Sequence, residues 1–263
     1  MCDIEKNKKE AKIIALAGKG GVGKTTICSA FVRIISEKYP DARILAIDAD
    51  PAVGLSTALG VEVKETLDDI RREIIELAAS GAGSDAVELL GEVRYRIFDA
   101  LTETDKFAFL AIGRPEGAGC YCAVNEYLKE VIDMVSRDFD YVIIDGEAGI
   151  EQINRRVMEK VTHLFLVTDA SKKGTKVAES IRQVADELVM YEKCGAIINR
   201  VEDMSVIPFI NIPDTDIIGV IESDTAHAKN DIMGKNIFEL PKEAPVYVGA
   251  KKALVRINIL ESI

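Results

Sequence analysis

The sequence has no apolar run near the roughly 20 residues that a bilayer-spanning helix needs. Its first twelve residues, Met1 to Lys12, are charged where a signal peptide would be apolar. Lys and Arg number 33 against 44 Asp and Glu, and the resulting net charge of −11 argues against wrapping nucleic acid or lying on anionic lipid. We therefore expect a cytoplasmic protein with no nucleic-acid or membrane partner.

Histidine and cysteine are also scarce. Only His163 and His227 are available, so a metal site has to draw mainly on sulfur or oxygen. Five cysteines is an odd number in a chain of this length, which fits a reducing compartment better than a disulfide framework. No period of 20–50 residues repeats, and no Ser- or Pro-rich linker divides the chain, so repeat and multidomain architectures are disfavoured.

What the 263 residues do contain is a recurring alternation of short apolar runs and helical patterns. Runs rich in Ile, Val and Leu, each too short for a typical helix, predict strands at 12–17, 43–48, 107–112, 141–145, 163–168, 194–199 and 216–221. Near-continuous apolar strands separated by helices indicate a parallel sheet covered on both faces. We expect one α/β domain over 1–263, with about seven mostly parallel strands and an insertion of surface helices at 61–106.

Residues 18–26, GKGGVGKTT, follow the first predicted strand and open a predicted helix, which is the context that the GxxxxGK[ST] pattern requires. Glycines let backbone N–H groups point at phosphate oxygens, while the lysine reaches the β/γ-phosphates and the first threonine offers a hydroxyl to Mg²⁺. A plain glycine turn explains neither the lysine nor the tandem threonines. The pattern assigns nucleotide binding to Gly20, Gly21, Val22, Gly23, Lys24, Thr25 and Thr26 of a single-domain P-loop NTPase.

Lys19 is a second lysine inside this loop, and one chain does not need it to cradle its own nucleotide. With it, residues 19–26 resemble the deviant Walker A loop of dimeric ATPases that include MinD, the arsenite-pump ATPase and the nitrogenase iron protein. The resemblance implies ATP and ADP as ligands, a homodimer formed with ATP, and catalytic roles for Lys24 and for Lys19, which would touch the partner's nucleotide. Alternatively, Lys19 is a solvated cation of the loop with no role at a dimer interface.

Two predicted strands end in carboxylates, at the edge where open α/β sheets bind ligands. Asp48 and Asp50 close the second strand, and Asp145 closes the strand at 141–145 in a Walker B-like segment. Carboxylates there can hold Mg²⁺ and orient a water. By resemblance, Asp50 positions the attacking water, Asp48 supports the metal and Asp145 is linked to Mg²⁺. An Asp before Pro is also an ordinary turn starter.

Two further positions complete the predicted nucleotide site. Gly149 could bring its backbone N–H to the γ-phosphate. Asn199 closes a later strand and has the paired donor and acceptor needed to read adenine's edge. In the wider family an Asn at this place contacts the base, although a lone Asn at a strand end is as often a turn former.

Cys120 and Cys122 end a glycine-rich stretch, GRPEGAGCYC, at 113–122. In an extended segment both thiolates can reach one soft ion at about 2.3 Å. One chain supplies only half of a four-ligand site, and the same pair from a symmetry mate is the simplest completion. A Cys-x-Cys pair by itself can also occur by chance or serve only in packing, without binding a metal. Cys28 and Cys194 are expected to be buried small hydrophobes.

The phosphate loop, the Cys-x-Cys stretch and residues 145–156 together resemble the CooC family of nickel-inserting ATPases and their relative AcsF. The resemblance implies a metallochaperone that carries Ni²⁺ or Zn²⁺ at the cysteine pair, for carbon monoxide dehydrogenase or acetyl-CoA synthase. Thiolates also suit other metals, so ligand type alone does not name the ion. Two other functions remain open: an ATP-gated iron–sulfur reductase like the nitrogenase iron protein, and a spatial regulator of the MinD type. For the regulator, a basic C-terminal membrane helix is expected, whereas residues 250–263 have few cations and favour docking onto the core.

Overall fold

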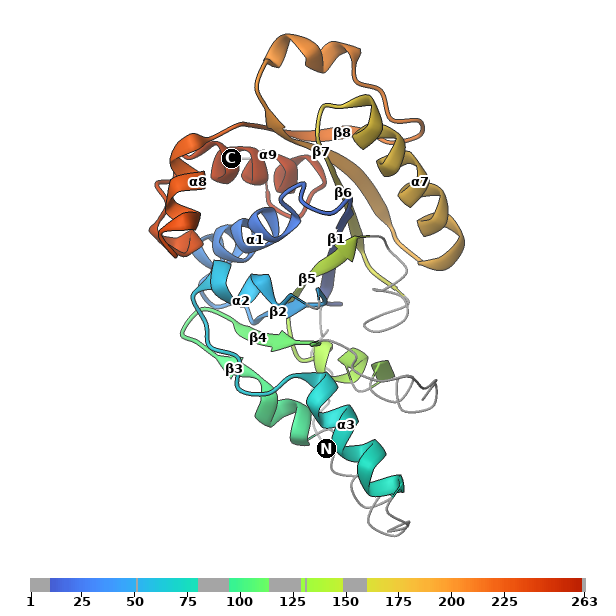
Figure 1. Cartoon of the computed structure of the whole chain (residues 1–263), viewed down its shortest axis with the longest axis vertical. Helices are drawn as coiled ribbons and strands as arrows, with labels where there is room; N and C mark the ends of the chain where they lie inside the picture. The colour runs from blue at the N-terminus through green and yellow to red at the C-terminus, as the bar shows by residue number, and fades with distance from the viewer. Residues whose placement is uncertain are drawn as a thin grey trace, which may run out of the picture.

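The computed structural model describes residues 10–50, 52–79, 95–113, 129–130, 132–148 and 160–261. These residues form an eight-stranded sheet in the order β3-β4-β2-β5-β1-β6-β7-β8 (Figure 1). All neighbouring pairs are parallel except β3 with β4. This confirms the predicted α/β fold with a mostly parallel sheet.

Seven strands lie where the apolar runs predict them. They are β1 Lys12–Gly18, β2 Ile44–Asp48, β4 Ala108–Ala111, β5 Tyr141–Ala148, β6 His163–Thr168, β7 Lys193–Val201 and β8 Ile217–Glu222. The eighth, β3 Thr102–Glu103, is a two-residue antiparallel edge strand. A strand of two residues is too short to show a hydrophobic pattern, so the sequence does not predict it.

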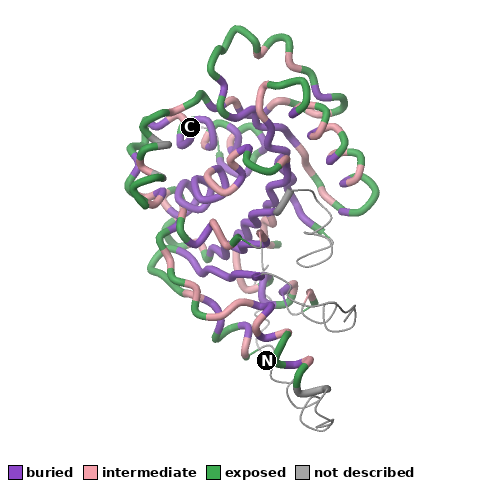
Figure 2. Tube along the Cα trace, in the orientation of Figure 1, coloured by how far each residue is buried: buried purple, intermediate pink, exposed green. Residues whose placement is uncertain are grey.

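Helices cover both faces of the sheet (Figure 1). Side chains of one parity along β1, such as Ile14 and Leu16, pack with α1 Lys24–Lys38, α2 Gly54–Leu59, η2 Ile237–Glu239 and α9 Pro245–Arg256. The alternate side chains, Ala15 and Ala17, belong to the core formed with α3 Leu67–Ala79 and α7 Lys172–Leu188. The sheet interior is therefore buried on both faces, and Figure 2 shows buried residues concentrated in the middle of the fold. The remaining elements are η1 Met204–Phe209 and α8 Thr225–Ile232.

The 61–106 segment contributes to the core and does not lie only on the surface. Ile70 and Ile74 of α3, and Ile97 in the helical residues 95–100, are almost fully buried in the cluster on the α7 side of the sheet. The expectation of purely surface helices is therefore wrong for these positions, because each helix is amphipathic and buries its apolar side. The assignment of this segment as an insertion within one domain stays a prediction.

The C-terminal helix α9 packs on the core, as predicted from its apolar spacing. Ala250, Ala253 and Leu254 are fully buried, and the helix contacts α1 and β8. Among the residues that the structure describes, no helix has both the length and the apolar character needed to cross a membrane.

Glu37 near the end of α1 links that helix to the C-terminal region. It accepts hydrogen bonds from Arg33 (2.8 Å) and from the Tyr247 hydroxyl of α9 (2.8 Å), and it pairs with Lys242 (2.8 Å). Partial burial by itself raises the pKa of Glu37, but the three donors outweigh it and lower that pKa to about 2. The native state thus stabilises the carboxylate form.

We expect Glu37→Gln to lower the free energy of unfolding by about 1–2 kcal/mol at pH 7, since a neutral amide binds these donors more weakly. The folded pKa is depressed, so the carboxylate's contribution is present above about pH 4.5 and is lost as the pH falls towards 2. The difference in stability between the parent and Glu37→Gln should therefore shrink at low pH. Denaturant unfolding of both proteins from pH 7 down to pH 3 measures this difference. Glu187→Gln, on the exposed side of α7, is the control. An equal effect of both variants would contradict the prediction.

Candidate functional site

The loop between β1 and α1 has the backbone of an anion-binding nest. Gly21 and Gly23 adopt left-handed φ values of +77° and +91°. Gly23 is also the N-cap of α1, where no side chain caps the helix and no acidic residue occupies the first turn. Loop and helix N–H groups therefore converge at a positively polarised helix terminus, the arrangement that binds phosphate.

Lys24 begins α1 and points its ammonium back across this loop. Its Nζ donates to the carbonyl oxygens of Gly18 (3.2 Å) and Lys19 (3.3 Å), and the residue is 7% exposed. The loop thus encloses a positive charge beside the N–H groups. This position fits the predicted contact with β/γ-phosphate oxygens.

Asp145 lies almost fully buried on β5, beside the first turn of α1. Neither of its carboxylate oxygens has a hydrogen bond of ordinary geometry within the described part of the chain. Burial raises the pKa of its carboxyl to about 7 and the charge of Asp48 adds to the shift, while the hydroxyl of Thr25 and the ammonium of Lys24 oppose it. A buried, unpartnered carboxylate next to a threonine hydroxyl suits a hard cation such as Mg²⁺.

Asp48 is the direct neighbour of Asp145, because the β2–β5 register pairs the two residues. Its carboxylate is fully buried and accepts backbone hydrogen bonds from Leu55 (2.8 Å) and Asp50 (3.1 Å). Burial raises the pKa of Asp48 to about 6 despite these bonds. Asp48 therefore both fixes the start of α2 and adds negative charge beside Asp145.

Asp50 lies in the turn that leads from β2 to α2. Its carboxylate accepts from the backbone of Ala52 (2.9 Å), so the ordinary turn role of an Asp before Pro is realised here. The turn lies close to the phosphate loop, since a Cβ on Gly54 would lie 3.8 Å from the methyl carbon of Thr25. The role of Asp50 in positioning water stays a prediction.

The carboxyl ends of β6 and β7 contact the phosphate loop from the other side. Asn199, which is 6% exposed, donates from Nδ2 to the carbonyl of Val22 (2.8 Å). Arg200 donates from Nη1 to the carbonyl of Gly21 (2.8 Å). In this structure Asn199 thus braces the loop, and its contact with the base stays a prediction.

The ammonium of Lys19 lies 4.0 Å from the Asp169 carboxylate, just after β6. Both side chains are about one third exposed, so this ion pair is weak. Hydrogen bonds from the hydroxyl and backbone N–H of Ser171 also lower the pKa of Asp169. Sequence reasoning assigned no role to Asp169 or Arg200, and their position at strand ends was the only signal for either.

Several predicted residues lie outside the described part of the chain. Gly149, Cys120 and Cys122 are among them. Within the described ranges, no group of three or more His, Cys, Asp or Glu residues is arranged to hold a metal ion.

The prediction that Cys28 is buried is confirmed. Burial, together with the charges of Asp145 and Asp48, raises the pKa of the Cys28 thiol. Cys194 is half-buried in β7, and burial raises its pKa to about 11. Both thiols are therefore protonated at neutral pH and unsuited to bind metal as they stand.

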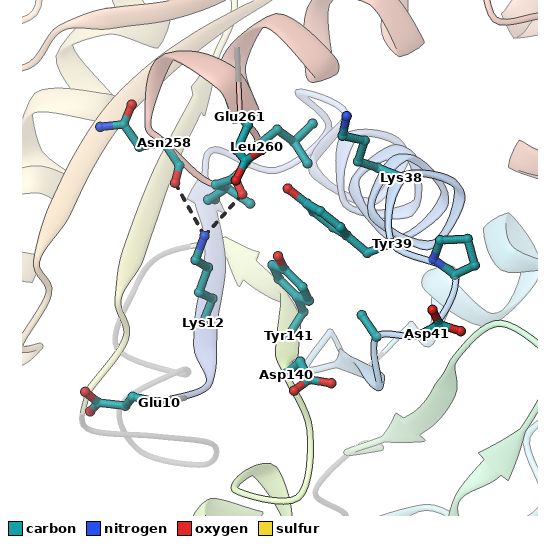
Figure 3. Close-up of a pocket in the computed structure, with 13 residues that line it drawn as sticks. Glu10, Lys12, Lys38, Tyr39, Asp41, Asp140, Tyr141, Asn258, Leu260 and Glu261 are labelled. Carbon is teal, nitrogen blue, oxygen red and sulfur yellow. Dashed lines mark hydrogen bonds between the residues drawn. The ribbon is translucent and has the colours of Figure 1, made fainter. Parts of the chain in front are cut away.

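A cavity of about 790 Å³ lies at the opposite end of the sheet (Figure 3). Tyr39 and Tyr141 stack in it with their ring centroids 5.8 Å apart. Lys12, at the start of β1, donates to the carbonyls of Asn258 and Ile259. Because β1 runs from this cavity to the phosphate loop, roughly 20 Å of strand separates the two. The cavity is not part of the phosphate site.

The model of the CbiA family, the CobQ/CobB/MinD/ParA nucleotide binding domain, matches residues 13–237. The chain belongs to this family of P-loop nucleotide-binding proteins. An uncharacterized ATP-binding protein of Methanocaldococcus jannaschii is 36% identical over 239 residues, covering 89% of this chain and 94% of that protein. The carbon monoxide dehydrogenase accessory protein CooC of Rhodospirillum rubrum is 28% identical, covering 86% and 89%.

The fold is similar to that of the septum site-determining protein MinD of Pyrococcus horikoshii, whose structure contains Mg-ADP. The TM-score is 0.67 at 20% identity, and the alignment covers 94% of this chain and 96% of that one. At this identity the likeness concerns the fold alone.

Proposed function

We propose that this protein is an ATP-hydrolysing metallochaperone that dimerises with ATP and helps to assemble a nickel centre. The observation that carries the ATPase part is the phosphate loop facing a buried, unpartnered Asp145. The resemblance to CooC, with a CooC relative at 28% identity, supports the metallochaperone part. The client proposed from that resemblance is carbon monoxide dehydrogenase or acetyl-CoA synthase.

In the proposed reaction, the loop N–H groups and Lys24 bind and orient the phosphates. Thr25, Asp48 and Asp145 would hold Mg²⁺, which supplies charge neutralisation at the phosphates when it is bound. Asp50 orients the attacking water through its carboxylate, and Asn199 contacts the base. ADP and phosphate then leave. The phosphate loop keeps its conformation through hydrogen bonds from Lys24, Asn199 and Arg200.

Dimerisation is proposed from Lys19. Lys19 has a weak ion pair with Asp169, and both side chains are about one third exposed, so the lysine can exchange that partner for another anion at low cost. Reaching the nucleotide of a second protomer would replace a screened contact with a charge-assisted one. ATP would then stabilise the face-to-face homodimer.

Metal transport is proposed from Cys120 and Cys122. Two such pairs, one from each protomer, would supply four thiolates to one ion, with Ni²⁺ as the cargo and Zn²⁺ as the competing occupant. ATP can change metal binding only if ATP binds the closed and open dimers with different affinities. The two dimer states must then also differ in their affinity for the metal.

The test compares the parent protein with a Cys120→Ser, Cys122→Ser variant. We measure metal per dimer by elemental analysis after Ni²⁺ or Zn²⁺ loading, and dimer fraction by light scattering, with and without MgATP. We expect the parent to bind one ion per dimer and the variant to lose that ion while it still hydrolyses ATP. A Cys28→Ser, Cys194→Ser variant is the matched control and should keep the metal.

Other outcomes separate the rival functions. Full metal loading of the Cys120→Ser, Cys122→Ser variant would contradict the shared site. A brown protein that absorbs near 400 nm and contains four irons per dimer would favour the iron–sulfur reductase. ATP-dependent binding to anionic vesicles without any metal requirement would favour the spatial regulator.

A further inference from the structure

The phosphate loop is held from behind through its carbonyl oxygens. The ammonium of Lys24 donates to the carbonyls of Gly18 and Lys19. Arg200 donates to the carbonyl of Gly21, and Asn199 donates to that of Val22. Every one of these donors is a side chain, and two of them come from the end of β7.

Each such contact fixes a whole peptide unit. The carbonyl of Gly21 and the N–H of Val22 belong to one planar group, so a donor on the oxygen also sets the direction of the N–H. Bonding at the oxygen polarises that N–H as well. The guanidinium of Arg200 thus orients and polarises the N–H of Val22 within the phosphate loop.

The backbone of β7 is distorted where this contact is made. Regular pairing with β8 is interrupted between Ile198 and Val201, and Arg200 has a left-handed φ of +58°. Successive side chains of a regular strand point to opposite faces. The irregularity instead lets both Asn199 and Arg200 reach the loop, which is what bulges beside functional sites do.

We propose that Arg200 is a positioning residue for polyphosphate binding, acting through the Gly21–Val22 peptide. This inference rests on the proposed binding of nucleotide at this loop. Its contribution concerns the phosphates and not the base, because the contact is to the loop that surrounds the phosphates. The left-handed backbone at Arg200 directs the guanidinium onto the loop.

The test uses Arg200→Gly, since glycine accepts a positive φ and removes only the guanidinium contact. We expect the dissociation constants for MgATP and for tripolyphosphate, which has no base, to rise together by about tenfold, because the Gly21–Val22 peptide is no longer held and polarised. Isothermal titration measures both. The melting temperature without ligand should stay within about 3 °C of the parent.

Arg256→Ala is the matched control. Arg256 is another exposed arginine that donates from Nη1 to a strand carbonyl, that of Ile217 at 3.1 Å, far from the loop in the fold. It should leave both dissociation constants unchanged. Arg200→Asn serves if the glycine variant does not fold, because Asn tolerates a left-handed backbone and is too short to replace the guanidinium.

Unchanged tripolyphosphate affinity in Arg200→Gly or Arg200→Asn, with a parent that binds well, would overturn the role of Arg200 alone. A loss confined to MgATP would assign Arg200 to the base and overturn it too. A parent that binds neither compound would contradict nucleotide binding at this loop, and the role of Arg200 with it.

Discussion

Replacing Lys24 with alanine is expected to weaken MgATP binding by at least about 100-fold. The ammonium is 7% exposed and is held against two loop carbonyls, so its charge acts on bound phosphates with little screening by water. Hydrogen bonds to charged groups contribute about 1.5–3 kcal/mol each, so the loss of two contacts between this ammonium and phosphate oxygens corresponds to roughly this change in affinity. Isothermal titration with MgATP measures it.

Lys38→Ala is the control for Lys24→Ala. Lys38 is the last residue of the same helix, is exposed and lies at the far end from the loop. It should leave MgATP affinity unchanged while producing the same change in net charge. If both lysine variants bind MgATP as the parent does, the loop does not hold the phosphates as the fold indicates.

Asp145→Asn is expected to have two opposite effects. The variant should be more stable than the parent without ligand above pH 7, because it removes a buried, unpartnered charge. It should also lose Mg²⁺-dependent ATP hydrolysis by at least about 100-fold, since an amide is a poor ligand for a hard cation. Stability gained together with activity lost is typical of a functional site.

The pH dependence follows from the raised pKa of Asp145. Folding raises it from 3.8 to about 7, so between these values the folded state binds the proton more tightly than the unfolded state. The stabilisation from the neutral acid is full below pH 3.8 and is lost as the pH rises through 7. The total is about 4 kcal/mol, and the Asp48 carboxyl contributes in the same direction.

Denaturant unfolding of ligand-free protein from pH 5 to pH 8.5 measures this effect. The parent should lose stability over the range, and Asp145→Asn should lose less. Asp105→Asn, at an exposed position between β3 and β4, is the control and should follow the parent. A parallel pH profile for Asp145→Asn and the parent would show that Asp145 is ionised in the ligand-free fold.

Much of this architecture could be predicted from local pattern. Short apolar runs placed seven strands, because a strand buried on both faces needs an unbroken row of apolar side chains. The glycines and Lys24 placed the phosphate loop, because its conformation and its charge are properties of adjacent residues. Asp48 and Asp145 could be placed near each other, since parallel strands end at one edge of the sheet, and their register confirms it.

The amino-acid sequence by itself thus determined the order of elements, the phosphate loop and the acidic edge of the sheet. Only the tertiary structure decided that Asn199 and Arg200 brace the loop, across 177 and 179 residues of chain. It alone left the oxygens of Asp145 without a hydrogen-bond partner among the described residues. The reason is physical: strands and nests follow from neighbouring residues, whereas a side chain's partner and its burial depend on which distant segments pack against it.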